Sequence, residues 1–282
     1  MNTNSQIMVR ASSLSEWLDC PRRAASRTFG AEIQAMGYEL KQLTNNIAAA
    51  IGTATHAGAT WTLDEKREHG VLGNETEAEH RALQALKDER ELGVSYDQTS
   101  PDVNTAEKQV VRHLKTFRVH IAPTIEPVAV EQRLEGQALD GVILSGQCDY
   151  TEKLLDRVLG EGIRDIKTGT KEKYHGAQLG AYSLLRRAHG ANVLSMAVDY
   201  IERVPLRKEQ PEPQKIIYNV AQTEALTWAT LRRIKRDHDE FQQTQDINTF
   251  LPNPASMLCS HKYCPAWGTN WCTHHSKKGE IE

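Results

Sequence analysis

The feature that most constrains this chain is a pair of short motifs, Gly146-Gln-Cys-Asp149 and Asp165-Ile-Lys167, each at the end of a run of strand-forming residues. Side chains alternate along a strand, so Asp165 and Lys167 are predicted to share one face while Ile166 occupies the other. If the two runs are neighbouring strands, Asp149 and Asp165 can share a divalent cation, because Mg²⁺ prefers carboxylate oxygens. An isolated Asp-x-Lys is more commonly a surface ion pair, so the rest of the chain must decide between these interpretations.

The spacing of apolar residues predicts a helical first part and a strand-rich second part. Helical patterns run from a cap at Ser13 to Cys20-Pro21, over 47–63, over 75–92, and from a Ser100-Pro101 cap to Ile121. After Pro123, strands are predicted at 127–134, 141–150, 162–167, 195–204 and 215–220, with helices at 174–189 and 223–243. The order helix, three strands, helix and strand predicts an α/β sandwich.

Composition places the chain among ordinary globular proteins, with 282 residues of which 25% are charged and 39% hydrophobic. The sequence contains neither an apolar stretch of membrane-helix length nor a signal peptide, so we expect a cytoplasmic protein without a membrane partner. The formal net charge is -3, and the field of the whole molecule therefore does not attract a polyanion. Any nucleic acid must bind a local basic patch.

Two further motifs flank the strand pair. Gly52-Thr-Ala-Thr-His56 places a histidine on a predicted helix, and Gln178-Leu-Gly-Ala-Tyr182 places two polar groups four residues apart on one helix face. If each motif is considered alone, His56 is interpreted as a core histidine and Tyr182 as a core aromatic residue. In this order, however, the four motifs resemble the RecB-type nucleases of the PD-(D/E)XK superfamily, which include the nuclease domains of bacterial RecB and AddB and the CRISPR-associated adaptation nucleases.

The resemblance implies a restriction-endonuclease-like core, a mixed sheet flanked by helices, and hydrolysis of DNA phosphodiester bonds, with exonuclease action on DNA ends. It also implies Mg²⁺ or Mn²⁺ as a cofactor. The implied metal ligands are His56, Asp149, Asp165 and the backbone carbonyl of Ile166. The implied catalytic residues are Asp149, Asp165, Lys167, Gln178 and Tyr182. Among these, Lys167 orients water or stabilises developing negative charge, and the last two contact DNA or hold the site together.

Four cysteines form a second constellation, with Cys20 before the core and Cys259, Cys264 and Cys272 after it. In a reducing compartment such cysteines indicate metal binding more than disulfides, and four thiolates suit either zinc or an iron–sulfur cluster. Some RecB-like nucleases, of the AddB and CRISPR adaptation types, ligate a [4Fe-4S] cluster with one cysteine before the core and three after it. The resemblance therefore implies a [4Fe-4S] cluster that ties the two ends of the chain together.

Zinc remains the alternative for the cysteine site, with His261, His274 and His275 as substitute ligands. Cys148 is excluded from either site, because strand alternation turns it away from the face of its neighbour Asp149.

Basic residues supply candidate contacts to nucleic acid. Lys171 and Lys173 follow the Asp-x-Lys strand and, with Tyr182, are predicted to bind DNA. The basic run at 232–236 is equally consistent with a solvated helix face. Trp267 and Trp271 either stack on bases or shield the cluster from solvent.

The predicted organisation is a single nuclease domain over 1–282, with a mostly helical part (13–125), a core (126–220), a long helix (221–250) and a cluster-binding tail (251–282). The chain has no P-loop motif, so the nuclease would act alone or with a helicase, a recombinase or CRISPR adaptation proteins. Its setting would be DNA recombination, end processing or CRISPR spacer acquisition. The alternatives are a catalytically silent nucleic-acid-binding or adaptor protein with a metal–cysteine staple, and a zinc-stapled scaffold with a fortuitous Asp-x-Lys.

Overall fold

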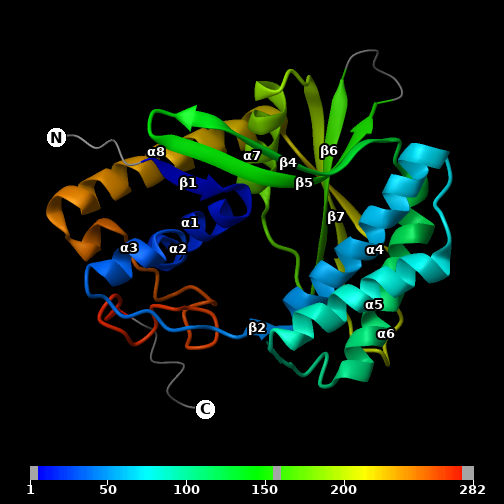
Figure 1. Cartoon of the computed structure of the whole chain (residues 1–282), viewed down its shortest axis with the longest axis horizontal. Coiled ribbons are helices and arrows are strands. Elements are labelled where there is room, and N and C mark those ends of the chain that lie inside the picture. The colour runs from blue at the N-terminus through cyan, green and yellow to red at the C-terminus, as the bar shows by residue number, and fades with distance from the viewer. Residues whose placement is uncertain (1–5, 155–159, 275–282) are drawn as a thin grey trace.

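The computed structural model describes residues 6–154 and 160–274, which fold around a six-stranded mixed sheet (Figure 1). Its strands are β1 (Ile7–Arg10), β4 (Pro127–Leu139), β5 (Val142–Lys153), β6 (Glu161–Gly169), β7 (Val193–Glu202) and β8 (Gln214–Tyr218). They follow the order β1-β5-β6-β7-β8, and β4 pairs with the other edge of β5. The pairs β1–β5 and β6–β7 are parallel, while the remaining pairs are antiparallel.

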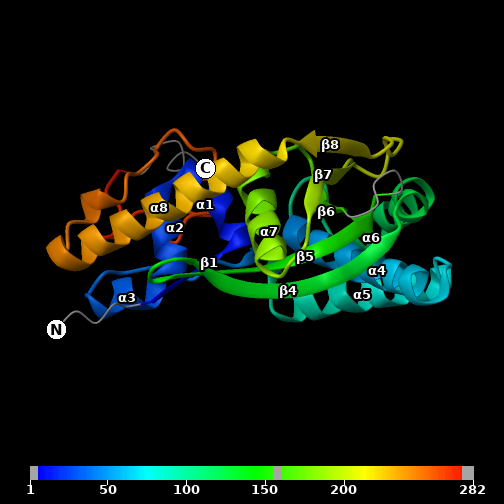
Figure 2. The same ribbon diagram turned by 90° about the horizontal axis from the view of Figure 1, so that it is seen from above.

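Helices cover both faces of the sheet, as the view from above shows (Figure 2). One face carries α7 (Gly176–Ala188) and α8 (Val220–Thr244), and the other carries α4 (Ile47–His69), α5 (Glu75–Glu91) and α6 (Val103–Thr116). Each face has its own apolar core. Thus Ile163 packs on the side of α7, whereas Ile166 packs on the side of α4. The predicted mixed α/β architecture, a sheet flanked by helices, is confirmed.

Several elements escape prediction because they are short. The four residues of β1 pair in parallel with residues 142–145, more than 130 positions away. A separate two-stranded sheet joins β2 (Asn45–Asn46) to β3 (Val94–Ser95). The helix α1 (Leu14–Asp19) ends before Pro21, as was predicted. Pro21 then occupies the first position of a new helix, α2 (Pro21–Thr28), and α3 (Gly30–Ala35) follows it.

Of the two predicted helix caps, one is correct in position and the other is wrong. Ser13 is the N-cap residue of α1 but makes no side-chain capping bond, since its hydroxyl donates to the carbonyl of Arg10. The cap of α6 is Asp102, whose carboxylate accepts from the backbone N–H of Thr105 at 2.7 Å. Ser100 is instead buried and bonds to Gln109. At α6, a nearby residue of equal capping ability therefore takes the role.

The tail beyond Leu251 folds back onto the N-terminal helices without a helix or strand of its own in its described part (Figure 1). The buried guanidinium of Arg22 donates to the carbonyls of Phe250 and Trp271 at 2.7 and 3.0 Å. In return the indole N–H of Trp271 donates to the carbonyl of Arg22 at 3.1 Å. Trp271 is fully buried against Phe241 and Phe250, so it does not stack on bases. Buried hydrogen bonds thus join the two ends of the chain independently of any metal.

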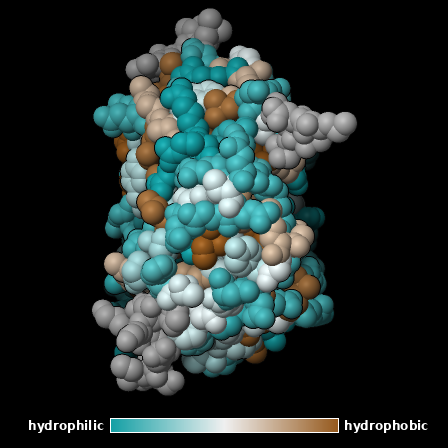
Figure 3. Space-filling view, turned by 90° about the vertical axis from the view of Figure 1, so that its left-hand side faces the viewer, coloured by the Kyte–Doolittle hydropathy of each residue, from teal (hydrophilic) through white to brown (hydrophobic). Residues whose placement is uncertain are grey.

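The end of the molecule seen in Figure 3 is largely hydrophilic, and its hydrophobic side chains are scattered among polar ones. Such isolated exposure is normal for a globular surface. Within the described ranges, no helix is long and apolar enough to cross a membrane.

Candidate active site

The site lies where the sheet opens beside β5. On one edge of this strand, β1 pairs with residues 142–145 and β6 pairs with residues 150–153. The stretch 146–149 falls between the two ladders and borders a cleft of about 770 Å³. Asp149 therefore lies in the middle of β5, whereas the sequence predicted it at the end of a strand. Its Oδ2 atom accepts a hydrogen bond from the backbone N–H of Ile166 at 2.7 Å, which connects the two diverging strands.

The glycines of two motifs let helices approach this opening closely. A Cβ atom on Gly146 would lie 2.9 Å from the ring of Tyr182, which packs directly over the strand. A Cβ atom on Gly52 would lie 3.2 Å from Oγ1 of Thr168, at the contact between α4 and β6. Larger residues at either position would push a helix, and the motif side chain it carries, away from the sheet.

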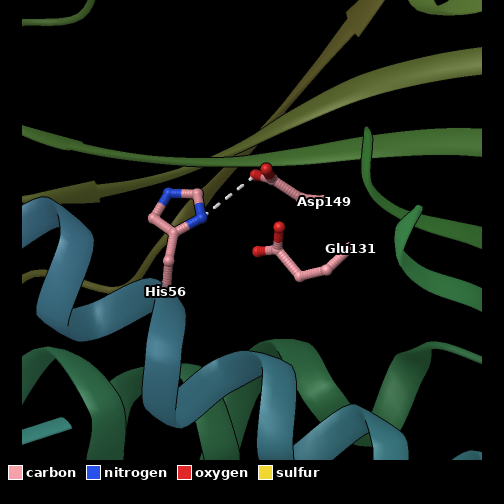
Figure 4. Close-up of side chains that lie close together, drawn as sticks. All are labelled: His56, Glu131 and Asp149. Carbon is pink, nitrogen blue, oxygen red and sulfur yellow. Dashed lines mark ion pairs between the residues drawn. The ribbon is translucent and has the colours of Figure 1, made fainter. Parts of the chain in front are cut away.

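His56 projects from α4 toward the carboxylate of Asp149 (Figure 4). The N-terminus of this helix is fixed by Asn46, whose side chain accepts from the backbone N–H of Ala49. The Nδ1 atom of His56 lies 3.4 Å from Oδ2 of Asp149. Desolvation in the cleft, followed by the nearby charge of Lys167, lowers the pKa of His56. The imidazole is therefore neutral near pH 7, which is the form that can ligate a metal.

Glu131 is a third member of this group that the sequence motifs did not identify (Figure 4). Its neighbours Val130 and Gln132 pair with Tyr150 and Cys148, which places Glu131 opposite Asp149 in the β4–β5 ladder. Its backbone has φ 49°, in the left-handed region that residues other than glycine seldom adopt. The Glu131 carboxylate accepts hydrogen bonds from Thr60, on α4, and from Gln147, on β5.

Asp165 and Lys167 project to the same side of β6, and the Nζ atom of Lys167 lies 2.7 Å from Oδ2 of Asp165. The side-chain amide of Gln178 lies 3.5 Å from Oδ1 of Asp165 and donates to the hydroxyl of Tyr182 at 2.6 Å. Asp165 is completely buried, whereas Lys167 is partly exposed on the cleft. The two motif residues of α7 thus form a buried chain behind the acid, and only the lysine reaches the solvent.

The charges at this site are crowded in a way that favours a cation. Burial, and then the neighbouring carboxylate of Asp165, raises the pKa of Asp149 well above its ordinary value. Burial opposes the charge of Lys167, but Asp165 and Asp149 outweigh it and raise the pKa of the lysine. A bound divalent cation would relieve both the desolvation and the mutual repulsion of the carboxylates.

The donor set fits a hard divalent ion. One ligand atom each from His56, Glu131 and Asp149 lies within 4.8 Å of the others. Carboxylate oxygens with a single imidazole suit Mg²⁺ or Mn²⁺. The implied ligand set instead contained Asp165 and the carbonyl of Ile166. Asp165 lies beside this group, where Lys167 and Gln178 already engage its oxygens.

The residues predicted to contact DNA are only partly brought to the cleft. Lys171 and Lys173 are exposed on the turn between β6 and α7 and do not line the cleft. Tyr182 does line it but is only 4% exposed. Two arginines that the sequence analysis did not single out line the cleft, Arg10 at the end of β1 and Arg133 on β4.

The four predicted cluster cysteines converge, although they come from opposite ends of the chain. Burial raises the pKa of the Cys264 thiol to about 11, and the adjacent thiols of Cys20 and Cys272 add to this effect. Burial likewise raises the pKa of Cys272, with contributions from Cys20 and Cys259. Cys148 lies elsewhere, buried in the core. Of the alternative ligands, His261 packs edge-on against Trp267, and His275 lies outside the described residues.

The fold and this acid–lysine site define a nuclease of the restriction-endonuclease type. The sequence profile of the PD-(D/E)XK nuclease superfamily matches residues 10–272, and the chain therefore belongs to this superfamily. No curated protein sequence matches the chain significantly.

Similar solved structures include the following two. One is a crystal structure of a protein from Eubacterium rectale that is named, provisionally, an exonuclease, with 11% identity, a TM-score of 0.53, and coverage of 83% of this chain and 81% of that one. This likeness supports the fold. The other is the crystal structure of SSO0001, with 12% identity and coverage of 78% and 84%, but its TM-score of 0.29 carries no argument.

Proposed function

We propose that this protein is a metal-dependent DNA nuclease of the RecB-like branch that hydrolyses phosphodiester bonds as an exonuclease. One observation carries the proposal: His56, Asp149, Asp165 and Lys167 meet at the opening of the sheet, on a cleft of about 770 Å³. The order of the four motifs supports the RecB-like assignment. The name of the Eubacterium rectale protein supports exonuclease action.

Each side chain has a physical role in this proposal. His56, Glu131 and Asp149, with Asp165 beside them, hold Mg²⁺ or Mn²⁺, which when bound supplies Lewis-acid activation of phosphate and water. Lys167 presents a partly exposed ammonium group to the cleft and donates hydrogen bonds to the attacking water or to the phosphate oxygens. The Gln178–Tyr182 pair keeps Asp165 in place.

DNA recombination, end processing and CRISPR spacer acquisition are the settings that suit such an enzyme. Partners would then be a helicase, a recombinase or CRISPR adaptation proteins. A cytoplasmic location fits each of these settings.

The decisive experiment is degradation of linear single- and double-stranded DNA, labelled at either end, by anaerobically purified protein. We expect cleavage with Mg²⁺ or Mn²⁺, no cleavage with EDTA, and none by the Asp149→Ala variant, which removes the carboxylate shared by the ligand group. The position of the label gives the polarity of digestion. Intact, metal-supplied protein that cleaves no substrate would instead favour the silent nucleic-acid-binding alternative.

We further propose that Cys20, Cys259, Cys264 and Cys272 bind a [4Fe-4S] cluster. A backbone N–H, that of Asn253, points at Sγ of Cys20 at 3.4 Å, as is common around ligating sulfur. In the described chain no three of these thiols lie within 4.8 Å of one another. Tetrahedral zinc with Zn–S bonds of about 2.3 Å needs sulfurs about 3.8 Å apart. Zinc would therefore require the thiols to move closer together, and the one-before, three-after pattern of the cysteines supports the cluster.

The Cys264→Ala variant tests the cluster directly. We expect the brown colour and the bound iron to be lost, and the melting temperature to fall by several degrees, because the site joins both ends of the chain. Cys148→Ala is the matched control, since it also removes a buried thiol but should retain iron. Colourless wild-type protein that contains zinc in place of iron would exclude the cluster.

A further inference from the structure

Two grooves continue the cleft toward the cysteine-bearing tail. Arg10 and Ser12 line both the cleft and a neighbouring groove of about 400 Å³. Arg27 lines that groove and also a third one of about 490 Å³, which runs between α2–α3 and residues 40–45. Because each hollow shares lining residues with the next, the three form one path along the surface.

This path is cationic although the protein as a whole is acidic. The cations that line the two outer grooves are Arg10, Arg27 and Lys41. Glu16 is the only carboxylate among the same lining residues, and it is already paired with Arg27 at 2.7 Å. The chain carries a net charge of -3, so this row of positive charge is a local feature and not a reflection of composition.

The arginine at the start of the path is available for a ligand. Arg10 is exposed at the end of β1, and across the described residues it has no carboxylate partner.

The far end of the path is built by the tail. The backbone N–H of Lys41 donates to the carbonyl of Pro265 at 2.8 Å, and its ammonium lies 5.1 Å from the ring centre of Trp267. The cysteine-bearing tail therefore positions the last cation of the row.

We propose that this path binds the phosphate backbone of a single DNA strand whose reacting end lies in the cleft. The inference rests on the proposed nuclease function and specifies its substrate. A groove that follows one backbone with a row of cations is the usual arrangement for single strands. Chain segments flank the third groove on both sides, and its volume of about 490 Å³ suits one strand better than a duplex.

Equilibrium binding of fluorescent oligonucleotides in EDTA, which prevents cleavage, tests the path. We expect Arg10→Ala and Lys41→Ala each to weaken binding of a single strand of about 12 nucleotides by roughly three- to tenfold and to reduce the salt dependence by about 0.7. For Lys41→Ala, the loss should diminish with oligonucleotides of about four nucleotides, which are too short to reach it. Lys41→Arg should restore binding. Arg27 is not substituted because it also holds Glu16 and the carbonyl of Tyr263.

Arg232→Ala is the matched control, because Arg232 is an exposed arginine on α8, within the competing basic run. Its affinity should stay within about twofold of wild type. A protein that cleaves DNA but binds equally well after the Arg10 and Lys41 substitutions, or that loses more affinity at Arg232, would overturn the path and leave the nuclease proposal intact. Preferred binding of duplex with the same losses would overturn the single-strand assignment. A protein that neither binds nor cleaves DNA would remove both proposals.

Discussion

Lys167→Ala is expected to lower the rate of DNA cleavage by at least about a hundred- to a thousandfold, the usual effect of losing one donor aimed at developing charge. Lys167 is the only motif side chain that both contacts Asp165 and remains partly exposed to the cleft among the described residues. Its removal opens no cavity in the core, so the fold should persist. Single-turnover rates at saturating Mg²⁺ or Mn²⁺, with circular dichroism as the check on folding, measure the effect.

Lys108→Ala is a suitable control for this experiment, because Lys108 is exposed on α6, away from the residues that line the cleft. Its rate should equal that of wild type. If Lys167→Ala also kept the wild-type rate, the charge at the reacting phosphate would have to be stabilised elsewhere, and the role of the Asp-x-Lys motif would be structural.

The parts of this site that sequence could predict are those set by local geometry. Strand alternation is enough to place Asp165 and Lys167 on one side of β6, and helical periodicity is enough to put Gln178 next to Tyr182. Neither argument requires knowledge of which strands are neighbours. The mixed α/β fold follows from the same periodicities.

Glu131 was missed because its position depends on pairing between strands. It faces Asp149 only through the register of the β4–β5 hairpin, which turns at Asp140-Gly141. Counting back equally from that turn would have identified Gln132 instead, because an extra residue between Gln137 and Leu139 shifts the register of the hairpin by one. Arg10 offered no comparable signal, since β1 is four residues long and pairs with a distant segment. The predicted cap of α6 failed for a different reason, because Asp102, two residues beyond Ser100, has similar capping ability.

The buried cluster next to the active site leads to the second large expected effect. Arg164, 2% exposed, binds both oxygens of Asp199 at 2.5 and 2.8 Å and also Glu152 at 3.1 Å. It thereby connects β5, β6 and β7 one residue before Asp165. Arg164→Met should lower the free energy of unfolding by about 3–5 kcal/mol, because it leaves buried carboxylates without their cation. Urea unfolding followed by circular dichroism measures this loss.

A double variant separates the cost of unpaired charge from the loss of packing. Replacing both partners of a buried ion pair with apolar residues is often neutral, so Arg164→Met combined with Asp199→Val should recover part of the lost stability. The rest should stay lost, because Glu152 loses its bond to Arg164 and the buried hydroxyl of Tyr150 loses its bond to Asp199. Arg81→Met is the exposed comparison, since the Arg81–Glu77 pair on α5 is about half exposed and should contribute only about 0.3–0.5 kcal/mol. If the double variant were as unstable as the single one, Arg164 would stabilise the sheet through its packing. Cleavage by the refolded double variant would then show whether the strands can hold Asp149 and Asp165 in place without the buried ion pair.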